Sequence, residues 1–115
     1  MAGPDPSVFE DDARLDEMAE NAKKATSMLK ALGHEGRLMI LCYLSQGERT
    51  VTELEEILSM RQPAVSQQLA RLRADDLISA RRDGKAIYYS IRDDRARKIM
   101  ELVYDLFCGR GSGTT

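Results

Sequence analysis

Residues 50–92 of the chain read TVTELEEILSMRQPAVSQQLARLRADDLISARRDGKAIYYSIR. The stretch holds a short amphipathic segment, a polar break that leads to Pro63, a second segment rich in Gln and Arg, and two β-branched and aromatic runs. Proline is tolerated in the first turn of a helix but not in its interior, so Pro63 marks the start of a second helix. Two short helices followed by a hairpin predict a winged helix-turn-helix, a mainly α fold with a small β-hairpin.

The first of these helices is expected to begin at Thr52, whose side-chain oxygen can accept a backbone hydrogen bond as N-cap. Acidic residues follow at once and suit the positive end of the helix dipole. We expect this helix to end near Ser59 or Met60, because polar residues lead from there to Pro63.

The second helix carries a polar face that is typical of DNA recognition. Ala64, Val65, Leu69 and Leu72 recur at helical spacing and form its buried stripe. The remaining faces carry side chains that suit a major groove, since Gln can pair with adenine and Arg with guanine. An ordinary solvated face is the alternative, but the basic hairpin that follows favours DNA. The candidate DNA-binding residues of this segment are Arg61, Gln62, Ser66, Gln67, Gln68 and Arg71.

The hairpin, predicted over 78–82 and 86–91, forms the wing. Asp83-Gly84 between its strands predicts a type I′ turn, which requires positive φ at both central positions. Three basic residues, Arg81, Arg82 and Lys85, flank the tip and are candidates for contact with phosphates or a minor groove. They could equally guard an edge strand against aggregation.

Length and charge set limits on the function. A chain of 115 residues forms one domain. It has neither a membrane-spanning apolar run nor the pattern of a signal peptide, so a cytoplasmic protein without membrane contact is expected. The net charge of −2 hides an asymmetry, since residues 1–20 carry a balance of −6 and residues 61–97 a balance of +4. The local field near the phosphates steers DNA binding, so the basic half is compatible with it.

The remaining segments frame this DNA-reading module. We expect a disordered N-terminal tail over residues 1–12, a domain over residues 13–108 and a flexible C-terminal tail over residues 109–115. A long first helix is predicted to end at Gly33, and a second, over 37–44, to be the most buried element. A last helix capped by Asp93-Asp94 carries an apolar stripe of Ala96, Ile99, Met100, Val103 and Phe107.

The first and last helices have apolar stripes that the helix-turn-helix and its wing do not need for their own core. Such stripes usually indicate a partner, so we expect dimerisation helices and a twofold homodimer on palindromic double-stranded operator DNA. The alternative is that both helices pack within their own subunit.

Two runs of sequence carry a resemblance to a known family. The run LKALGHEGRLMIL at 29–41, together with QPAVSQQL at 62–69 and the Asp83-Gly84-Lys85 wing, resembles the ArsR family of bacterial repressors over roughly residues 20–108. The resemblance implies a dimeric winged helix that leaves DNA when an inducer is sensed. Most members sense metals.

The residues do not supply the metal sites of this family. The thiolate site would lie on the helix that carries Glu53 to Glu56, which has no cysteine, and the single histidine, His34, is far from the last helix. Zinc needs four N, S or O ligands and soft metals need clustered thiolates. We therefore expect no metal and no cofactor, and interpret His34 as a helix-start residue.

The two cysteines, Cys42 and Cys108, resemble in their placement the persulfide-responsive BigR and SqrR branch of the family. On composition alone two cysteines are most often inert buried thiols. The resemblance implies instead that they sense low-molecular-weight persulfides or polysulfides, one thiolate attacking the outer sulfur and the other closing a bridge of several sulfurs.

Three other functions stay open at this point. The chain could be a general redox sensor that forms a direct disulfide, a metal-responsive repressor, or an interaction protein that uses the winged fold without DNA. An enzyme is not expected, because the sequence has no phosphate loop and no catalytic cluster.

Overall fold

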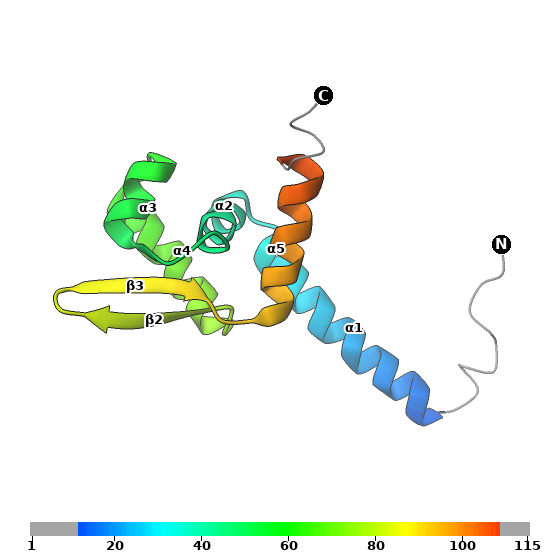
Figure 1. The fold of residues 1–115 in the computed structure, drawn as a ribbon. Helices are drawn as coiled ribbons and strands as arrows, with labels where there is room; N and C mark the ends of the chain where they lie inside the picture. The colour runs from blue at the N-terminus through cyan, green and yellow to red at the C-terminus, as the bar shows by residue number, and fades with distance from the viewer. Residues whose placement is uncertain (1–11, 109–115) are drawn as a thin grey trace. The chain divides into compact units, whose positions relative to one another are not determined.

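A computed structural model describes residues 12–108. Most of the two predicted tails, residues 1–11 and 109–115, lies outside this range, and Asp12 already belongs to the first helix. The chain divides into two compact units, one up to Lys30 and one from Ala31 onward. In chain order the elements are α1 (Asp12–Leu32), α2 (Glu35–Leu44), β1 (Arg49–Thr50), α3 (Val51–Leu58), α4 (Gln62–Ala74), β2 (Ile78–Asp83), β3 (Ala86–Ile91) and α5 (Asp94–Phe107) (Figure 1).

The first unit consists of most of α1, and its apolar side chains are uncovered. Leu15, Met18 and Leu29 are each more than two fifths exposed. The helix ends at Leu32, immediately before Gly33, as expected. Ala31 and Leu32 already belong to the second unit and are buried there.

The second unit has a core to which every helix and the sheet contribute. The side chains that are at most 4% exposed include Ile40, Leu41 and Leu44 of α2, Leu54 of α3, Val65, Leu69 and Leu72 of α4, Ile78 and Ile91 of the sheet, and Ala96 and Met100 of α5. The helix α2 has the smallest share of exposed residues among the helices of the described chain, as predicted, although it begins at Glu35 rather than Arg37 and its Met39 is 41% exposed. A helix at the edge of a small core has only one stripe to cover.

The start of α3 differs from the prediction by two residues. Thr50, not Thr52, is the N-cap, and Glu53 completes a capping box with it. The Glu53 N–H donates to Thr50 Oγ1 at 3.1 Å, and the Thr50 N–H donates to Glu53 Oε1 at 2.8 Å. The Thr-x-x-Glu spacing of 50–53 is the sequence signature of this box. As expected, α3 ends at Leu58, followed by Ser59 as its C-cap.

This cap gives a first prediction. Thr50→Ala removes an acceptor that satisfies one of the unpaired N–H groups of α3, and we expect a loss of about 1 kcal/mol in the free energy of unfolding. Thr52→Ala is the matched control, since the Thr52 side chain is exposed and is not the cap, and it is expected to change stability by less than about 0.5 kcal/mol. Urea unfolding followed by circular dichroism measures both. Equal losses in the two variants would contradict this assignment of the cap.

The sheet has one strand more than the sequence predicted. The order is β1-β3-β2, with Arg49 opposite Tyr89 and Thr50 opposite Tyr88 in the added pair. The hairpin pairs Asp83 with Ala86, so its central turn residues are Gly84 and Lys85. Gly84 has a φ of 65°, while Ser59 and Asp76 are the only non-glycine residues with positive φ in residues 12–108. Lys85 therefore does not have a positive φ, whereas a type I′ turn requires one at both central residues. A glycine at the first central position is typical of a type II′ turn, so the prediction of a type I′ turn centred on Asp83-Gly84 is wrong.

The last helix begins as predicted. Asp93 is its N-cap and accepts hydrogen bonds from the Arg95 and Ala96 backbone N–H groups at 2.8 and 3.1 Å. Burial alone would raise the pKa of Asp93, but these bonds and the Arg95 side chain hold it below its ordinary value. Only the first half of the predicted stripe is buried, because Phe107 is 76% exposed.

Candidate functional site

Helix α4 presents most of the predicted polar side chains to solvent. Arg61, Gln62, Gln67 and Arg71 are exposed, and Ser66 is half-buried. The helix begins with Arg61 as N-cap and Pro63 in its first turn. With 3.6 residues per turn, Gln67 lies opposite the buried stripe of Val65, Leu69 and Leu72.

Gln68 differs from its neighbour Gln67. It is half-buried, and its Oε1 accepts a hydrogen bond from Nη1 of Arg37 in α2 at 3.3 Å. The same guanidinium donates from Nε to the Ala31 carbonyl oxygen at 2.7 Å. Gln68 thus braces α4 against α2, and it is separated from the outward set that sequence reasoning grouped it with.

Arg71 has a partner on its own helix. Its Nε lies 3.0 Å from Oδ2 of Asp75, one turn further on, and both side chains are at least one third exposed. A surface pair of this kind is weak and readily exchanged. Arg71 therefore remains a candidate for contact with DNA, in competition with Asp75.

The three basic residues predicted for the wing fall into two kinds. Arg82 and Lys85 are exposed and have no ion pair within residues 12–108. Arg81 instead forms a two-pronged ion pair with Glu48, from Nε to Oε2 and from Nη2 to Oε1, both at 2.7 Å. The hydrogen bond with Arg81 lowers the pKa of Glu48, and that with Glu48 raises the pKa of Arg81.

A cavity adjoins the tip of the wing. This cavity of about 410 Å³ is lined by the start of α3, which contributes Val51 and Thr52, and by Lys85, Ala86 and Ile87 of the wing. The sequence predicts Thr52 as a helix cap and carries no signal that places it beside the wing. The exposed side chain of Thr52 beside Lys85 makes this residue an additional candidate for contact with phosphate.

The two cysteines line one cavity between α2 and α5. This thiol cavity has a volume of about 760 Å³ and is mainly apolar, lined by Leu38, Met39, Cys42, Tyr43, Gln46, Val103, Tyr104, Phe107 and Cys108. Both thiols are free, Cys42 half-buried and Cys108 exposed. Burial raises the pKa of Cys42, and the charge of Cys108 raises it further. The sequence left open whether these residues meet, and the fold brings them to the same cavity.

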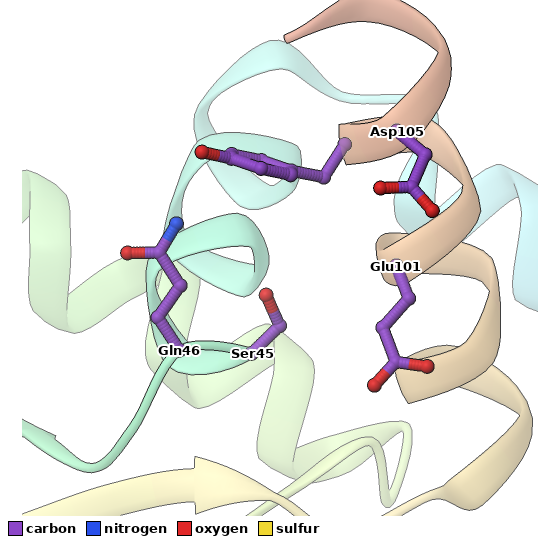
Figure 2. Close-up of a pocket in the computed structure, with 5 residues that line it drawn as sticks. Ser45, Gln46, Glu101 and Asp105 are labelled. Atoms are coloured by element: carbon purple, nitrogen blue, oxygen red, sulfur yellow. The ribbon is translucent and has the colours of Figure 1, made fainter. Parts of the chain in front are cut away.

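A polar cavity of about 570 Å³ shares Gln46 and Tyr104 with the thiol cavity. Figure 2 shows Glu101 and Asp105 on α5 facing Ser45 and Gln46, which follow α2. The Ser45 hydroxyl donates to the Cys42 carbonyl oxygen at 2.6 Å. Ser45, the C-cap of α2, is thus hydrogen-bonded to the backbone of Cys42.

Residues 12–108 contain no group of three or more His, Cys, Asp or Glu side chains that could hold a metal ion. His34 is the N-cap of α2, and its Nδ1 accepts from the Gly36 and Arg37 backbone N–H groups at 3.1 and 3.4 Å. The interpretation of His34 as a helix-start residue is therefore confirmed. No helix in the described part of the chain has the length and apolar character that a membrane span requires.

Comparisons with known proteins agree with this geometry. The model of the arsR family of bacterial regulatory proteins matches residues 34–80. The biofilm growth-associated repressor of Agrobacterium fabrum is 43% identical over 94 residues, which cover 82% of this chain and 80% of that protein. This chain belongs to the ArsR family. As an ArsR-family protein it is a DNA-binding transcriptional regulator and not an enzyme, and the predicted family and winged-helix fold are confirmed.

Solved structures of winged helix-turn-helix regulators superpose on this one. Reduced HlyU from Vibrio cholerae has a TM-score of 0.78 and 39% identity, covering 80% of this chain and 97% of that one. The repressor BigR from Xylella fastidiosa has a TM-score of 0.74 and 36% identity, covering 83% and 97%. A domain from Mycobacterium bovis described as homodimeric has a TM-score of 0.69 and 30% identity, covering 92% and 89%.

Proposed function

We propose that this ArsR-family chain is a cytoplasmic repressor that binds palindromic operator DNA as a homodimer and releases it when sulfur bridges Cys42 and Cys108. The observation that carries the proposal is the shared apolar cavity of the two thiols between α2 and α5. Low-molecular-weight persulfides or polysulfides are the proposed inducers. The resemblance to BigR, a repressor, supports the direction of the response.

Cys108 is the thiol proposed to react first. It is exposed at the end of α5, whereas Cys42 is half-buried with a raised pKa and therefore has less thiolate near neutral pH. The Cys108 thiolate attacks the outer sulfur of a persulfide RSSH, the S–S bond of the reagent breaks, and RS⁻ leaves. The product is a persulfide on Cys108.

A second persulfide molecule modifies Cys42 in the same way and brings the sulfur needed for a bridge. The terminal sulfur of one cysteine persulfide then attacks the inner sulfur of the other, and HS⁻ leaves. Two RSSH and two thiols thus give one trisulfide bridge, two RSH and one H₂S. The sulfane sulfur of the inducer is the oxidant, so no other oxidant is required.

A bridge of several sulfurs between Cys42 and Cys108 has two consequences. A direct disulfide requires Cα atoms within about 7 Å, and a chain of three or more sulfurs relaxes that limit. The bridge would join α2 to α5 and so bias the arrangement of the two helices. A coupling of about 1 to 3 kcal/mol is enough to change operator affinity about 5- to 150-fold.

Exposed apolar side chains support the homodimer. On α5, Leu102, Leu106 and Phe107 are each more than half exposed, and α1 adds Leu15 and Leu29. Large apolar side chains left exposed on a helix are typical of an interface rather than of a free surface. A twofold dimer would set two α4 helices about 34 Å apart, one turn of DNA. The homodimeric relative from Mycobacterium bovis supports the same assembly.

The test compares reduced, peroxide-treated and persulfide-treated protein on a palindromic operator isolated by selection from random DNA. We expect tight binding in the reduced state and release after persulfide treatment, measured by fluorescence anisotropy. Mass spectrometry of the released protein is expected to show a bridge between Cys42 and Cys108 that contains added sulfur.

A general redox sensor is the second candidate, because the same cavity could in principle close a direct disulfide. In that case peroxide alone would release the operator, and the bridge would show only the loss of two hydrogens. Retention of the operator after complete bridging by sulfur would exclude the persulfide sensor, and retention after complete formation of the direct disulfide would exclude the redox sensor.

A further inference from the structure

Glu48 connects the helix that carries Cys42 to the wing. It lies between α2 and β1 in the chain, and its carboxylate binds Arg81 of β2 through two hydrogen bonds of 2.7 Å. Arg81 is 33 residues further along the chain, so the pair bridges two parts of the fold. Figure 1 shows the closed end of the hairpin pointing away from α5.

The segment from Cys42 to Glu48 is held by hydrogen bonds at successive residues. The Ser45, Gln46 and Gly47 N–H groups donate to the carbonyl oxygens of Leu41, Tyr43 and Leu44 at 2.9, 3.1 and 3.2 Å. The Ser45 hydroxyl adds its bond to the Cys42 carbonyl, and Gln46 lines the thiol cavity. A displacement of the last turn of α2 would therefore be carried to Glu48 rather than absorbed by a loose loop.

The other end of the connection is equally well held. Arg81 lies opposite Tyr88 in the hairpin, and its guanidinium carbon lies 4.8 Å from the centre of the Tyr88 ring. Stacking on a ring together with a two-pronged carboxylate contact fixes the plane of a guanidinium. The prongs use Nε and Nη2, which are the donors that a phosphate would otherwise take.

We propose that Glu48 is a positioning residue that ties the wing to the end of α2 through Arg81, so that the state of the thiols alters the position of the wing on DNA. This inference rests on the proposed function. Arg82 and Lys85 contact phosphate in this scheme, while Arg81 orients the wing that carries them. Isolated exposed ion pairs add little to stability, but a small bias on the position of the wing is enough to regulate.

The test measures the ratio of operator dissociation constants between the bridged and reduced states for Glu48→Gln. We expect this ratio to fall about two- to fivefold relative to the unsubstituted protein, because the wing no longer follows α2. Arg81→Lys is expected to lower it similarly, since lysine keeps the charge but loses the fork and the stacking. Mass spectrometry confirms that each protein is bridged, and the thermal midpoint confirms that it is folded.

Asp76→Asn is the matched control. It also removes one carboxylate from an exposed ion pair of the wing region, with Arg92 at 3.7 Å, but that pair does not involve the segment after α2. Asp76 has a φ of 58°, a conformation that asparagine accepts. We expect this variant to keep the full ratio.

Three outcomes would overturn the inference. If Glu48→Gln left the ratio of operator dissociation constants unchanged, the wing would respond to the thiols without the Glu48–Arg81 ion pair. Equal strengthening of both states would make Arg81 a direct DNA contact released by the substitution, and an equal fall in Asp76→Asn would reduce the effect to charge alone. Failure of the unsubstituted protein to release DNA is a distinct result, because it removes the proposed function before any variant is compared.

Discussion

Replacing Cys108 by serine is expected to leave operator binding by the reduced protein unchanged and to abolish its release by persulfide. Cys108 is exposed and lies outside the core, so the substitution does not disturb the fold. Without its sulfur no bridge to Cys42 can close. Fluorescence anisotropy with the selected operator measures both states, and the expected loss is the whole inducible change of about 5- to 150-fold.

Cys42→Ser gives the matched comparison and separates capture of sulfur from closure of the bridge. This variant keeps the exposed thiol, so it is expected to take up sulfur at Cys108 and still hold the operator. The Cys108→Ser protein keeps only Cys42, whose pKa is raised by burial, so it is expected to take up sulfur more slowly at neutral pH. Its rate should rise with pH and keep rising beyond 9.0, the ordinary pKa of a cysteine thiol, because the pKa of Cys42 lies above that value. Release of DNA by either single-thiol protein would contradict the bridge.

The elements of the fold could be predicted where a local pattern decides them. Pro63 in the first turn of α4, the cap at Asp93 and the glycine of the wing turn each fix a boundary by local backbone chemistry. The two-residue strand β1 has no such pattern, because it exists only through its pairing with β3. The register of the wing turn likewise depends on the pairing of β2 with β3, because Gly84 suits either of the two central positions of a two-residue turn.

The sequence predicts the orientation and partners of single side chains less well than it predicts the helices and strands. The sequence predicts Arg81 as a DNA contact because it lies near Arg82 and Lys85, and nothing near it in sequence indicates Glu48 as a partner. Gln68 gave a weak signal, since it follows Val65 by three residues and precedes Leu72 by four, which puts it at the edge of the buried stripe. The proposed pairing of Cys42 with Cys108 comes from resemblance alone, and the structure adds that both residues line the same cavity.

The two adjacent glutamines of α4 provide the sharpest test of how this protein reads DNA. Gln67 lies on the exposed face and is free to pair with a base edge, whereas Gln68 is half-buried and bound to Arg37. We expect Gln67→Ala to weaken operator binding by about 1 to 3 kcal/mol, which is about 5- to 150-fold, and to relax the preference at one base pair of each half-site. The salt dependence of binding is expected to stay the same, since no phosphate contact is lost.

Gln68→Ala is the control of equal chemistry and opposite orientation. It removes a brace between α4 and α2, so it is expected to lower the free energy of unfolding by about 0.5 to 1.5 kcal/mol while the base preference stays unchanged. Anisotropy titrations against the operator and single-base variants, with urea unfolding in parallel, measure both effects. If Gln68→Ala relaxed the base preference and Gln67→Ala did not, α4 would enter the groove with a different face, and the exposed residues opposite Val65, Leu69 and Leu72 would not be the reading surface.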